Sequence, residues 1–448
     1  MAINRVKYKC ENCGATTSSW SGRCHSCGEW NTITEELQIS SVRGATANGK
    51  ELATSNIKEI AKNQSEKRIQ SGMEEVDTVL GGGFVYGSVN LVAGQPGIGK
   101  STLLLQLASL ISNKHKVLYI SGEESIHQIA MRANRLGAKD TNLKISSSSS
   151  SDDIAKTIAT KDFQFVVIDS IQTMRVEAVG SAPGSISQIT NSTHLLSLVA
   201  KKSNTTLVLV GHVTKEGSIA GPKVLEHMVD VVLQLDGDRY GGLKMLRGVK
   251  NRFGSTNETG IFDMQDKGLM PVSNPSATLL AERQINDGSI VLATIEGSRP
   301  LLVEVQALVN KTNYGYPKRA ASGIDLNRVN LLIAMLERRT KLNLSDQDIY
   351  VNIVGGIKIS EPASDLALCM AIASASKGMQ LKKNAVVFGE LGLSGEVRHV
   401  PYIEKRLAEA KKLGFDGGIG PVVRTGRKPA NLHSVGSIKE ALNKFLSN

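Results

Sequence analysis

The chain has 448 residues, of which 41% are hydrophobic and 21% charged, so most of it should be globular and divided into two or three domains. No apolar run approaches the roughly 18 residues of a membrane span. The first residues lack the apolar stretch of a signal peptide, so we expect a cytoplasmic protein with no membrane partner. The net charge of +11 suits a polyanionic partner such as nucleic acid, but it is equally compatible with a charge that serves solubility alone.

Four of the five cysteines fall within the first 27 residues, as two C-x-x-C pairs. These cysteines are Cys10, Cys13, Cys24 and Cys27. Each pair makes a tight turn that aims two thiolates inward, and two such turns close a tetrahedral site that suits zinc. A redox motif is the alternative, but two pairs so close together fit it poorly. Trp20 and Trp30 flank the second turn, and we expect them to cover the metal.

The N-terminal zinc finger should occupy residues 1–37. Residues 38–67 are polar and weakly periodic, and they are typical of a linker with one short helix at 56–63.

A glycine-rich loop at residues 94–102 matches the pattern G-x-x-x-x-G-K-[ST]. Its residues are Gly94, Gln95, Pro96, Gly97, Ile98, Gly99, Lys100, Ser101 and Thr102. Apolar residues precede the loop and a leucine-rich run follows it, which is the order of strand, loop and helix that a phosphate cradle needs. Lys100 would reach the β- and γ-phosphates, and the hydroxyl of Ser101 would hold Mg²⁺. The loop predicts a nucleotide site.

Strand and helix patterns alternate after this loop. Strands are expected at 116–121, 143–146, 165–169 and 206–210, and helices at 126–136, 154–160 and 192–202. Asp152 or Asp153 should cap the second of these helices. The alternation indicates a mostly parallel sheet with helices on both faces.

Ligands of such sheets bind outside the carboxyl ends of the strands. Asp169 ends a buried strand there and would hold Mg²⁺ through water. Glu123 or Glu124 would orient the attacking water, and a charge that stabilises a helix N-terminus is the alternative role for Glu123. His212 would either sense the γ-phosphate or serve packing. Two long polar loops, 173–190 and 215–223, leave the same edge and should carry function.

The segments 94–102, 120–125, 166–170 and 211–217 together resemble a RecA-type ATPase core. The run Lys250, Asn251, Arg252, Phe253 and Gly254 resembles the signature of the RadA/Sms family of bacterial DNA repair proteins. The resemblance covers nearly the whole chain. It implies an ATP-dependent motor that binds single-stranded and branched DNA, promotes branch migration in homologous recombination, and works as a hexameric ring beside a recombinase filament.

The same resemblance implies roles for individual residues. Lys100, Ser101 and Asp169 would bind ATP and Mg²⁺, and Glu123 rather than Glu124 would be the catalytic glutamate. Lys250 and Arg252 would reach the γ-phosphate of a neighbouring subunit, or they would contact DNA. The two loops would face single-stranded DNA, and the second of them carries Lys215 and Lys223.

The composition changes after Pro275, and residues 276–448 resemble the Lon-protease-like domain, leaving 68–275 for the ATPase. Short strands are expected at 278–280, 289–295 and 301–308, and helices at 325–339 and 361–376. The expected fold class is thus an α/β RecA-like core, preceded by a four-cysteine zinc ribbon and followed by an α+β Lon-protease-like domain.

Proteolytic members of that family use a Ser–Lys dyad. Ser364 or Asp365 stands at the serine position, and Glu404 stands at the lysine position with Lys405 next to it. A shift of one residue turns a helical side chain by about 100°. We therefore expect a non-proteolytic domain. An ATP-dependent protease remains the second hypothesis, and a non-motor ATP switch of the circadian-clock type is the third.

Basic and aromatic residues gather near the start of this domain, a combination suited to contact with phosphates and bases. They are Tyr314, Tyr316, Lys318, Arg319 and Arg328. A solvated surface patch would have the same composition.

Overall fold

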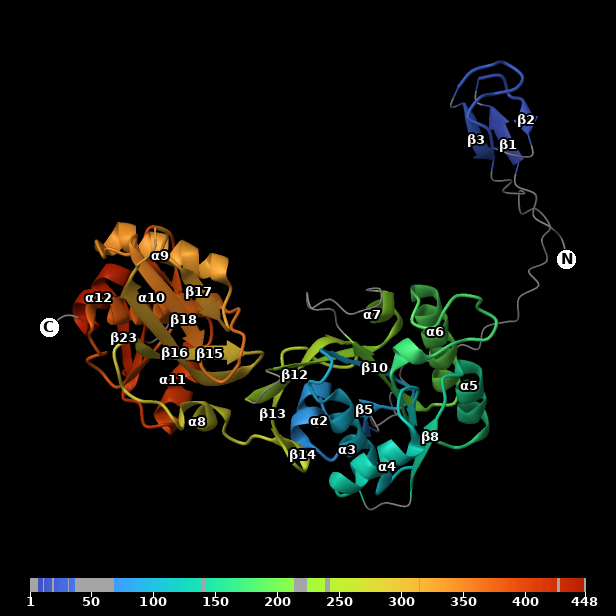
Figure 1. Cartoon of the computed structure of the whole chain (residues 1–448), viewed down its shortest axis with the longest axis horizontal. Helices are drawn as coiled ribbons and strands as arrows, with labels where there is room; N and C mark the ends of the chain where they lie inside the picture. Colours follow the sequence, from blue (N-terminus) through green and yellow to red (C-terminus); the bar gives the residue numbers. More distant parts are fainter. Residues whose placement is uncertain are drawn as a thin grey trace. The chain divides into compact units, whose positions relative to one another are not determined.

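The computed structural model describes residues 7–10, 12–17, 20–30, 32–36, 68–138, 142–212, 224–237, 242–313, 315–424 and 428–446. The chain forms two compact units, Met1–Ser65 and Glu66–Asn448 (Figure 1). The expected linker helix at 56–63 lies outside the described residues. The domain border expected after residue 275 lies inside the second unit.

The first unit is a small antiparallel sheet with the strand order β2-β1-β3. Its strands are β1 (Lys7–Cys10), β2 (Thr16–Thr17) and β3 (Ile33–Glu36). Within its described part, the buried core consists of Cys10 and Cys24, with Ala15 packed against them. So small an apolar core cannot hold a fold by itself, and a metal between the thiols is the usual substitute.

The second unit begins with a nine-stranded sheet of the order β14-β13-β12-β11-β6-β10-β9-β7-β8. Its parallel strands are β6 (Val89–Gly94), β7 (Val117–Ser121), β8 (Leu143–Ser147), β9 (Phe165–Asp169), β10 (Thr206–His212) and β11 (Val231–Gly237). The strands β12 (Leu243–Asn251), β13 (Thr259–Gln265) and β14 (Gly268–Pro271) continue it in antiparallel fashion. A short pair, β4 (Arg68–Ile69) and β5 (Phe84–Val85), stands outside it.

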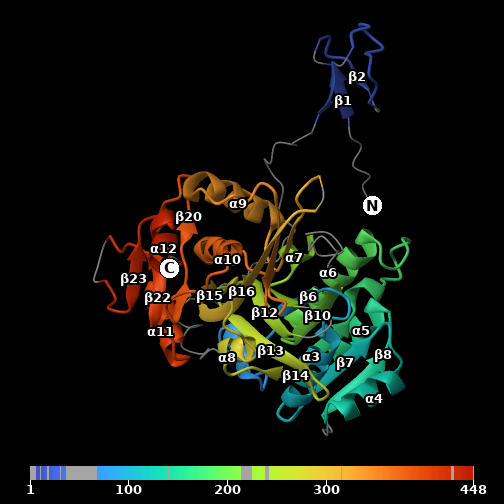
Figure 2. The same cartoon turned by 60° about the vertical axis from the view of Figure 1, so that its left-hand side comes forward.

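Helices cover both faces of this sheet (Figure 2). The helices α2 (Glu74–Leu80), α3 (Lys100–Ser112) and α4 (Ile126–Arg135) pack on one face. The helices α5 (Ser151–Thr160), α6 (Ile186–Lys202) and α7 (Val224–Met228) pack on the other, with the 3-10 turn η1 (Ile171–Thr173). Strands such as β6 and β9 are buried at every residue, because helices shield both their sides. The expected alternation is confirmed.

Two helix starts differ from expectation, and serine side chains explain both. The α5 helix is capped by Ser150, whose hydroxyl accepts a hydrogen bond from the backbone N–H of Asp153, so neither Asp152 nor Asp153 is the cap. The α6 helix begins at Ile186 rather than at 192, because Ser185 caps it in the same way through Gln188. The expected loop 173–190 is therefore shorter, ending at Ser185.

The C-terminal part is built on a seven-stranded sheet of the order β17-β18-β16-β15-β19-β22-β23. Its strands are β15 (Ser289–Glu296), β16 (Arg299–Lys311), β17 (Arg319–Ser322), β18 (Gln347–Ile353), β19 (Ala385–Val387), β22 (Gly417–Pro421) and β23 (Leu432–Val435). The strands β20 (Glu390–Leu391) and β21 (Val397–Arg398) form a separate pair.

The helices α9 (Leu326–Thr340), α10 (Asp365–Lys377) and α12 (Ile438–Phe445) share one core with this sheet, and α11 (Ile403–Lys412) packs on the other face. The 3-10 turn η2 (Pro362–Ser364) precedes α10. The strand expected at 278–280 is wrong, since helix α8 (Pro275–Leu280) occupies that stretch. Asn274 caps α8 and Pro275 stands in its first turn, where a missing N–H costs nothing. Among the described residues, no helix has the length and apolarity needed to cross a membrane.

A single hydrophobic core joins the two sheets of the second unit. Leu243, Met245 and Ile261 of the nine-stranded sheet cluster with residues of the C-terminal sheet such as Ile290 and Val303. Ion pairs reinforce this contact: Arg299 donates to Glu75 at 2.8 Å, and Arg247 donates to Glu296 at 2.8 Å. The ATPase-like and C-terminal sheets therefore form one unit.

Candidate nucleotide site and metal centre

The glycine-rich loop connects β6 to α3 at the carboxyl edge of the sheet. Gly97 and Gly99 have φ angles of 80° and 113°, which disfavour any residue with a side chain. A Cβ at Gly99 would lie 2.5 Å from Cε of Met264, a flexible side chain that could move, so the positive φ angle is the main reason for glycine there. Ser101 and Thr102 follow in the first turn of α3, half-buried beside the loop.

Lys100 is buried at the start of α3 and folds back over the loop. Its Nζ donates hydrogen bonds to the carbonyl oxygens of Gly94, at 2.9 Å, and Gln95, at 3.0 Å. Desolvation lowers the pKa of Lys100 to about 8, while the charges of Asp169 and Glu123 act in the opposite direction. An ammonium that is poorly solvated and near two carboxylates is well suited to receive phosphate oxygens.

Asp169 ends β9 with its side chain buried. Its carboxylate accepts a hydrogen bond of 2.6 Å from the phenol of Tyr119, which lies on the adjacent strand β7. Burial, and secondly the charge of Asp169, raises the pKa of Tyr119 well above its usual value, so the phenol keeps its proton. Tyr119 is a residue that the sequence analysis missed. Its only signal was a phenol hydroxyl in the middle of a buried and mostly apolar strand.

Glu123 stands at the end of β7 with half of its side chain exposed. Its Oε1 accepts a hydrogen bond of 2.7 Å from Ser170 and lies 3.9 Å from Nε2 of His212. Burial, and secondly the charge of Lys100, lowers the pKa of His212, which favours neutral imidazole. The strand ends therefore bring Lys100, Glu123, Asp169 and His212 to one edge.

The neighbouring Glu124 has a different environment. Its carboxylate pairs with Arg132 of α4, and both side chains are largely buried. Glu124 is thus committed to holding α4, while Glu123 keeps a carboxylate near Lys100. Of the two glutamates, Glu123 is the one whose carboxylate lies beside Ser170 and His212 at the sheet edge.

The segment 250–254 lies at the opposite end of the sheet from the glycine-rich loop of the same chain. Asn251 pairs with Val231, and Val231 pairs with Asn90 near the start of β6, whereas Gly94 ends that strand. Four residues of strand separate the two places by roughly 13 Å. Lys250 and Arg252 are therefore not brought to the glycine-rich loop of their own chain.

Hydrogen bonds fix the conformation of this segment. Asn251 donates to the carbonyl oxygen of Leu80 at 3.3 Å and accepts a hydrogen bond of 2.9 Å from the backbone N–H of Phe253. A Cβ at Gly254 would lie 3.2 Å from the amide nitrogen of Asn251, so a small residue is favoured there.

The two cations of the segment differ. Lys250 donates to the carbonyl oxygens of Glu226 and Val229 at 2.6 and 2.7 Å, so its ammonium is used within the fold. Arg252 has an exposed side chain whose guanidinium pairs at 3.0 Å with the buried carboxylate of Asp230. Asp230 also accepts from the backbone N–H of Val89 and from Lys201. Arg252 is thus an exposed cation whose guanidinium is held in place by a buried, well-bonded carboxylate.

The candidate DNA contacts have mixed outcomes. Lys215 and Lys223 lie outside the described residues. Lys318 and Arg319 lie at the outer strand β17 of the C-terminal sheet, where Arg319 pairs with Ile349. Arg328, however, pairs with the buried Asp365, so it is not available to DNA in the way the sequence suggested.

The structure does not bring a Ser–Lys dyad together. Ser364 is buried, and its hydroxyl donates to the carbonyl oxygen of Glu361 at 2.8 Å. Lys405 donates to the carbonyl oxygen of Ser298 at 3.3 Å. Asp365, the other residue considered for the serine position, is held by Arg328.

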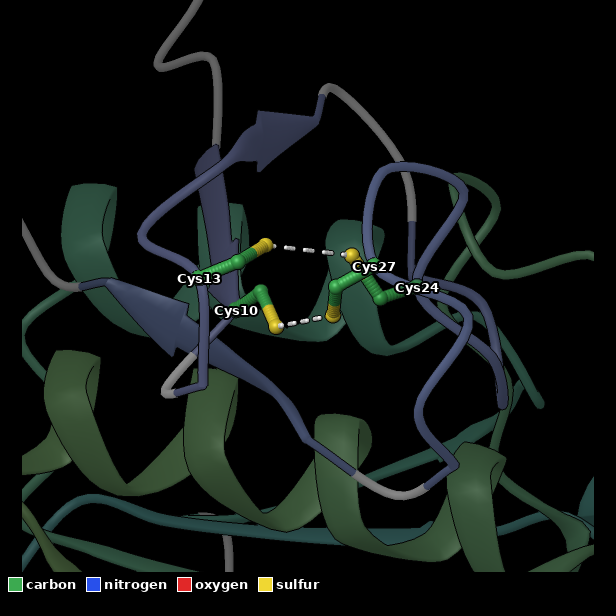
Figure 3. Close-up of side chains that lie close together, drawn as sticks. All are labelled: Cys10, Cys13, Cys24 and Cys27. Carbon is green, nitrogen blue, oxygen red and sulfur yellow. Dashed lines mark hydrogen bonds between the residues drawn. The ribbon is translucent and has the colours of Figure 1, made fainter.

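The four N-terminal cysteines form a compact sulfur cluster, shown in Figure 3. The Sγ atoms lie 3.7 Å apart for Cys10 and Cys27, and 3.6 Å apart for Cys13 and Cys24, and all four lie within 4.8 Å of one another. A tetrahedral zinc ion with Zn–S bonds of about 2.3 Å needs sulfurs about 3.8 Å apart. The thiols therefore fit zinc.

The two cysteine turns repeat the same geometry. The N–H of Gly14 donates to the carbonyl oxygen of Cys10, and that of Gly28 to Cys24, both at 2.9 Å. Both glycines have positive φ angles, of 74° and 79°. The expectation that the tryptophans cover the metal is wrong, because Cys13 and Cys27 remain exposed.

Comparisons with known proteins agree with these features. Family models match at residues 57–218 (AAA domain), 8–35 (rubredoxin metal binding domain) and 320–423 (subunit ChlI of Mg-chelatase). The chain is 46% identical to the DNA repair protein RadA of Pseudomonas aeruginosa, with 99% of both chains covered. It is 47% identical to that of Listeria monocytogenes, with 99% of both covered, and 45% identical to that of Bacillus subtilis, with all of both covered.

Two solved structures are also similar over 46% of this chain. One is the RadB recombinase, with 23% identity, all of that chain covered and a TM-score of 0.38. The other is a KaiC-like protein from Pyrococcus horikoshii, with 19% identity, 99% of that chain covered and a TM-score of 0.39.

Proposed function

The chain belongs to the RadA family of bacterial DNA repair proteins, and from that premise we propose that it is an ATP-driven, DNA-binding motor of homologous recombination and repair. It hydrolyses ATP in the presence of Mg²⁺ and is stimulated by single-stranded DNA. It uses that energy for helicase action and branch migration on branched DNA, as a homo-hexamer that works beside a recombinase filament.

The convergence of Lys100, Glu123 and Asp169 at one sheet edge carries the proposal. In this site the backbone N–H groups of residues 94–102 hold the phosphates, and Lys100 neutralises the β- and γ-phosphates. Ser101 and Asp169 would hold Mg²⁺, which would supply positive charge beside the β- and γ-phosphate oxygens as negative charge develops on them. Glu123 orients and deprotonates the attacking water.

The position of Arg252 supports a ring. An exposed cation at the edge remote from its own glycine-rich loop can serve catalysis only at the site of another copy. Arg252 would there stabilise the charge on the γ-phosphate, while Lys250 would hold the segment in shape. Contact of both residues with DNA is the alternative, and Lys215 and Lys223 would line the DNA channel in either case.

The C-terminal domain has a non-proteolytic role in this proposal, because Ser364 and Lys405 bond elsewhere. Residues 276–448 would assist ring assembly and contact DNA through Lys318 and Arg319. The functional division would be a zinc finger at 1–37, a linker at 38–67 and the ATPase at 68–275.

ATP hydrolysis measured with and without single-stranded DNA tests the proposal. We expect stimulation that falls steeply as salt rises, because phosphate contacts release counterions. Lys100→Ala should abolish turnover and branch migration without unfolding the protein. Hydrolysis indifferent to DNA at low salt would contradict the motor and favour an ATP switch. Degradation of casein by the purified protein would favour the protease.

A further inference from the structure

The first unit exposes two large aromatic side chains. Trp20 and Trp30 are the only tryptophans of the chain, and 62% and 67% of their surfaces are accessible. Indole rings normally bury most of their surface, because they are large and mostly apolar. Two exposed rings in so small a unit indicate a contact surface.

The two rings flank one glycine. A Cβ placed on Gly22 would lie 3.9 Å from Cη2 of Trp20 and 3.9 Å from Cζ3 of Trp30. Atoms of both rings therefore lie within contact distance of the same point, and Gly22 places no side chain there.

A cation is fixed beside one ring. The guanidinium of Arg23 lies 5.8 Å from the ring centre of Trp30, within the range of a cation–π contact. Its Nε donates to the carbonyl oxygen of Gly28 at 2.7 Å, and Arg23 and Trp30 form an isolated antiparallel bridge. The backbone thus holds the cation and the ring together.

The surroundings of the two rings are not those of a hydrophobic protein-docking groove. Residues 12–17 and 20–30 contain no leucine, isoleucine, valine or methionine. A surface of flat π-faces and one guanidinium, without aliphatic side chains, matches a ligand with flat faces and anionic links. Single-stranded nucleic acid has that chemistry, because its bases are free to stack and its backbone carries phosphates.

We propose that Trp20, Arg23 and Trp30 form a base-stacking site for single-stranded DNA. One or two bases stack on the indoles, and Arg23 meets the adjoining phosphate. Duplex DNA is excluded because its bases are already stacked on each other. The inference rests on the proposed function, since it names a part of the chain that holds the single strand on which the motor acts.

Tryptophan fluorescence of the full-length, zinc-loaded protein tests this directly. Both fluorophores lie in the proposed site, so emission reports on it alone. Titration with an oligothymidylate should quench the emission saturably, and a matched duplex should not. Trp20→Leu and Trp30→Leu should each weaken binding of a labelled oligothymidylate by roughly tenfold, measured by anisotropy. Trp20→Phe and Trp30→Phe, which keep an aromatic face, should retain most of the affinity.

The outcomes separate this inference from the proposed function. If anisotropy shows binding but the emission does not change and the leucine variants bind normally, the stacking site is wrong and the motor stands. If no single-stranded DNA binds at all, the motor itself fails. If the leucine variants lose only the association with a recombinase, the surface docks protein and the inference is overturned. If a leucine variant loses zinc, its weaker binding does not test the site. The quenching of the wild-type emission and the DNA affinity of the phenylalanine variants then decide whether the stacking site exists.

Discussion

Two adjacent glutamates that follow β7 have different partners and different exposure. Glu123 accepts a hydrogen bond from Ser170 and keeps half of its side chain exposed near Lys100, whereas Glu124 is paired with Arg132. Both residues lie in the bend after β7, where their backbone N–H groups donate to the hydroxyl of Ser121, and the bend directs only Glu124 toward α4.

Glu123→Gln should therefore lower the rate of ATP hydrolysis by roughly 10²- to 10⁴-fold while leaving ATP binding intact, because it removes a base and no phosphate ligand. Glu124→Gln is the matched control. It should keep turnover but lose about 1–2 kcal/mol of unfolding free energy, because it breaks a largely buried ion pair. Steady-state hydrolysis, ATP binding and urea unfolding measure the three effects. Loss of turnover in Glu124→Gln alone would reverse the assignment.

For individual residues, the sequence predicts well which of them end strands, but it predicts their side-chain partners poorly. The rule that carboxyl ends of parallel strands meet at one edge placed Asp169, Glu123 and Lys100 together. The bond from Tyr119 to Asp169 joins residues 50 positions apart, so it depends on the order of strands in the sheet. That order is a property of tertiary packing, and no local pattern expresses it.

Short elements show the same limit. Residues 278–280 were predicted as a strand because a run of three apolar or β-branched residues fits either type. Asn274 and Pro275 were the deciding signals, since an amide cap followed by proline starts a helix. The long amphipathic helix α9 lies within one residue of its predicted bounds at both ends, because many positions support one period.

The segment 250–254 makes a prediction about assembly. If Arg252 acts on the ATP of a neighbouring subunit, a mixture of Lys100→Ala and Arg252→Ala proteins should regain hydrolysis that neither has alone. Random assortment around a ring pairs an intact glycine-rich loop with an intact arginine at about a quarter of the sites. The ATPase rate of premixed subunits, across mixing ratios, measures this.

A second mixture provides the control. Lys100→Ala mixed with Glu123→Gln should stay inactive. In the proposed site both residues act on the ATP bound by their own subunit, so a neighbouring subunit cannot replace either of them. Failure of the first mixture to gain activity would argue that Arg252 contacts DNA or supports the fold through Asp230.

For the molecule as a whole, composition predicted a domain border after residue 275, but one hydrophobic core contains residues from both sides of that position. Leu243 and Met245 of the ATPase-like sheet share a cluster with Ile290 and Val303. A composition change marks where a chain begins a new pattern, but it cannot show whether two patterns pack on each other. The zinc ribbon was predicted with better success, because its four thiols lie close together in sequence, between Cys10 and Cys27.

The two units should therefore respond differently to loss of metal. Within the described part of the ribbon the buried core is two of the cysteines and little else, so chelation or Cys10→Ser should unfold it. The second unit has its own extensive cores and should keep its thermal transition and its basal ATP hydrolysis. Zinc content, limited proteolysis of the ribbon and the melting curve measure these effects.

Cys369→Ser is the matched control, because Cys369 is fully buried in the C-terminal core. It should leave the zinc content unchanged and lower the melting temperature, since a hydroxyl replaces a thiol among apolar side chains. The two cysteine variants should thus have opposite signatures, one in metal content and one in the main transition. A fall of that transition on chelation would show that the ribbon stabilises the second unit, contrary to the prediction.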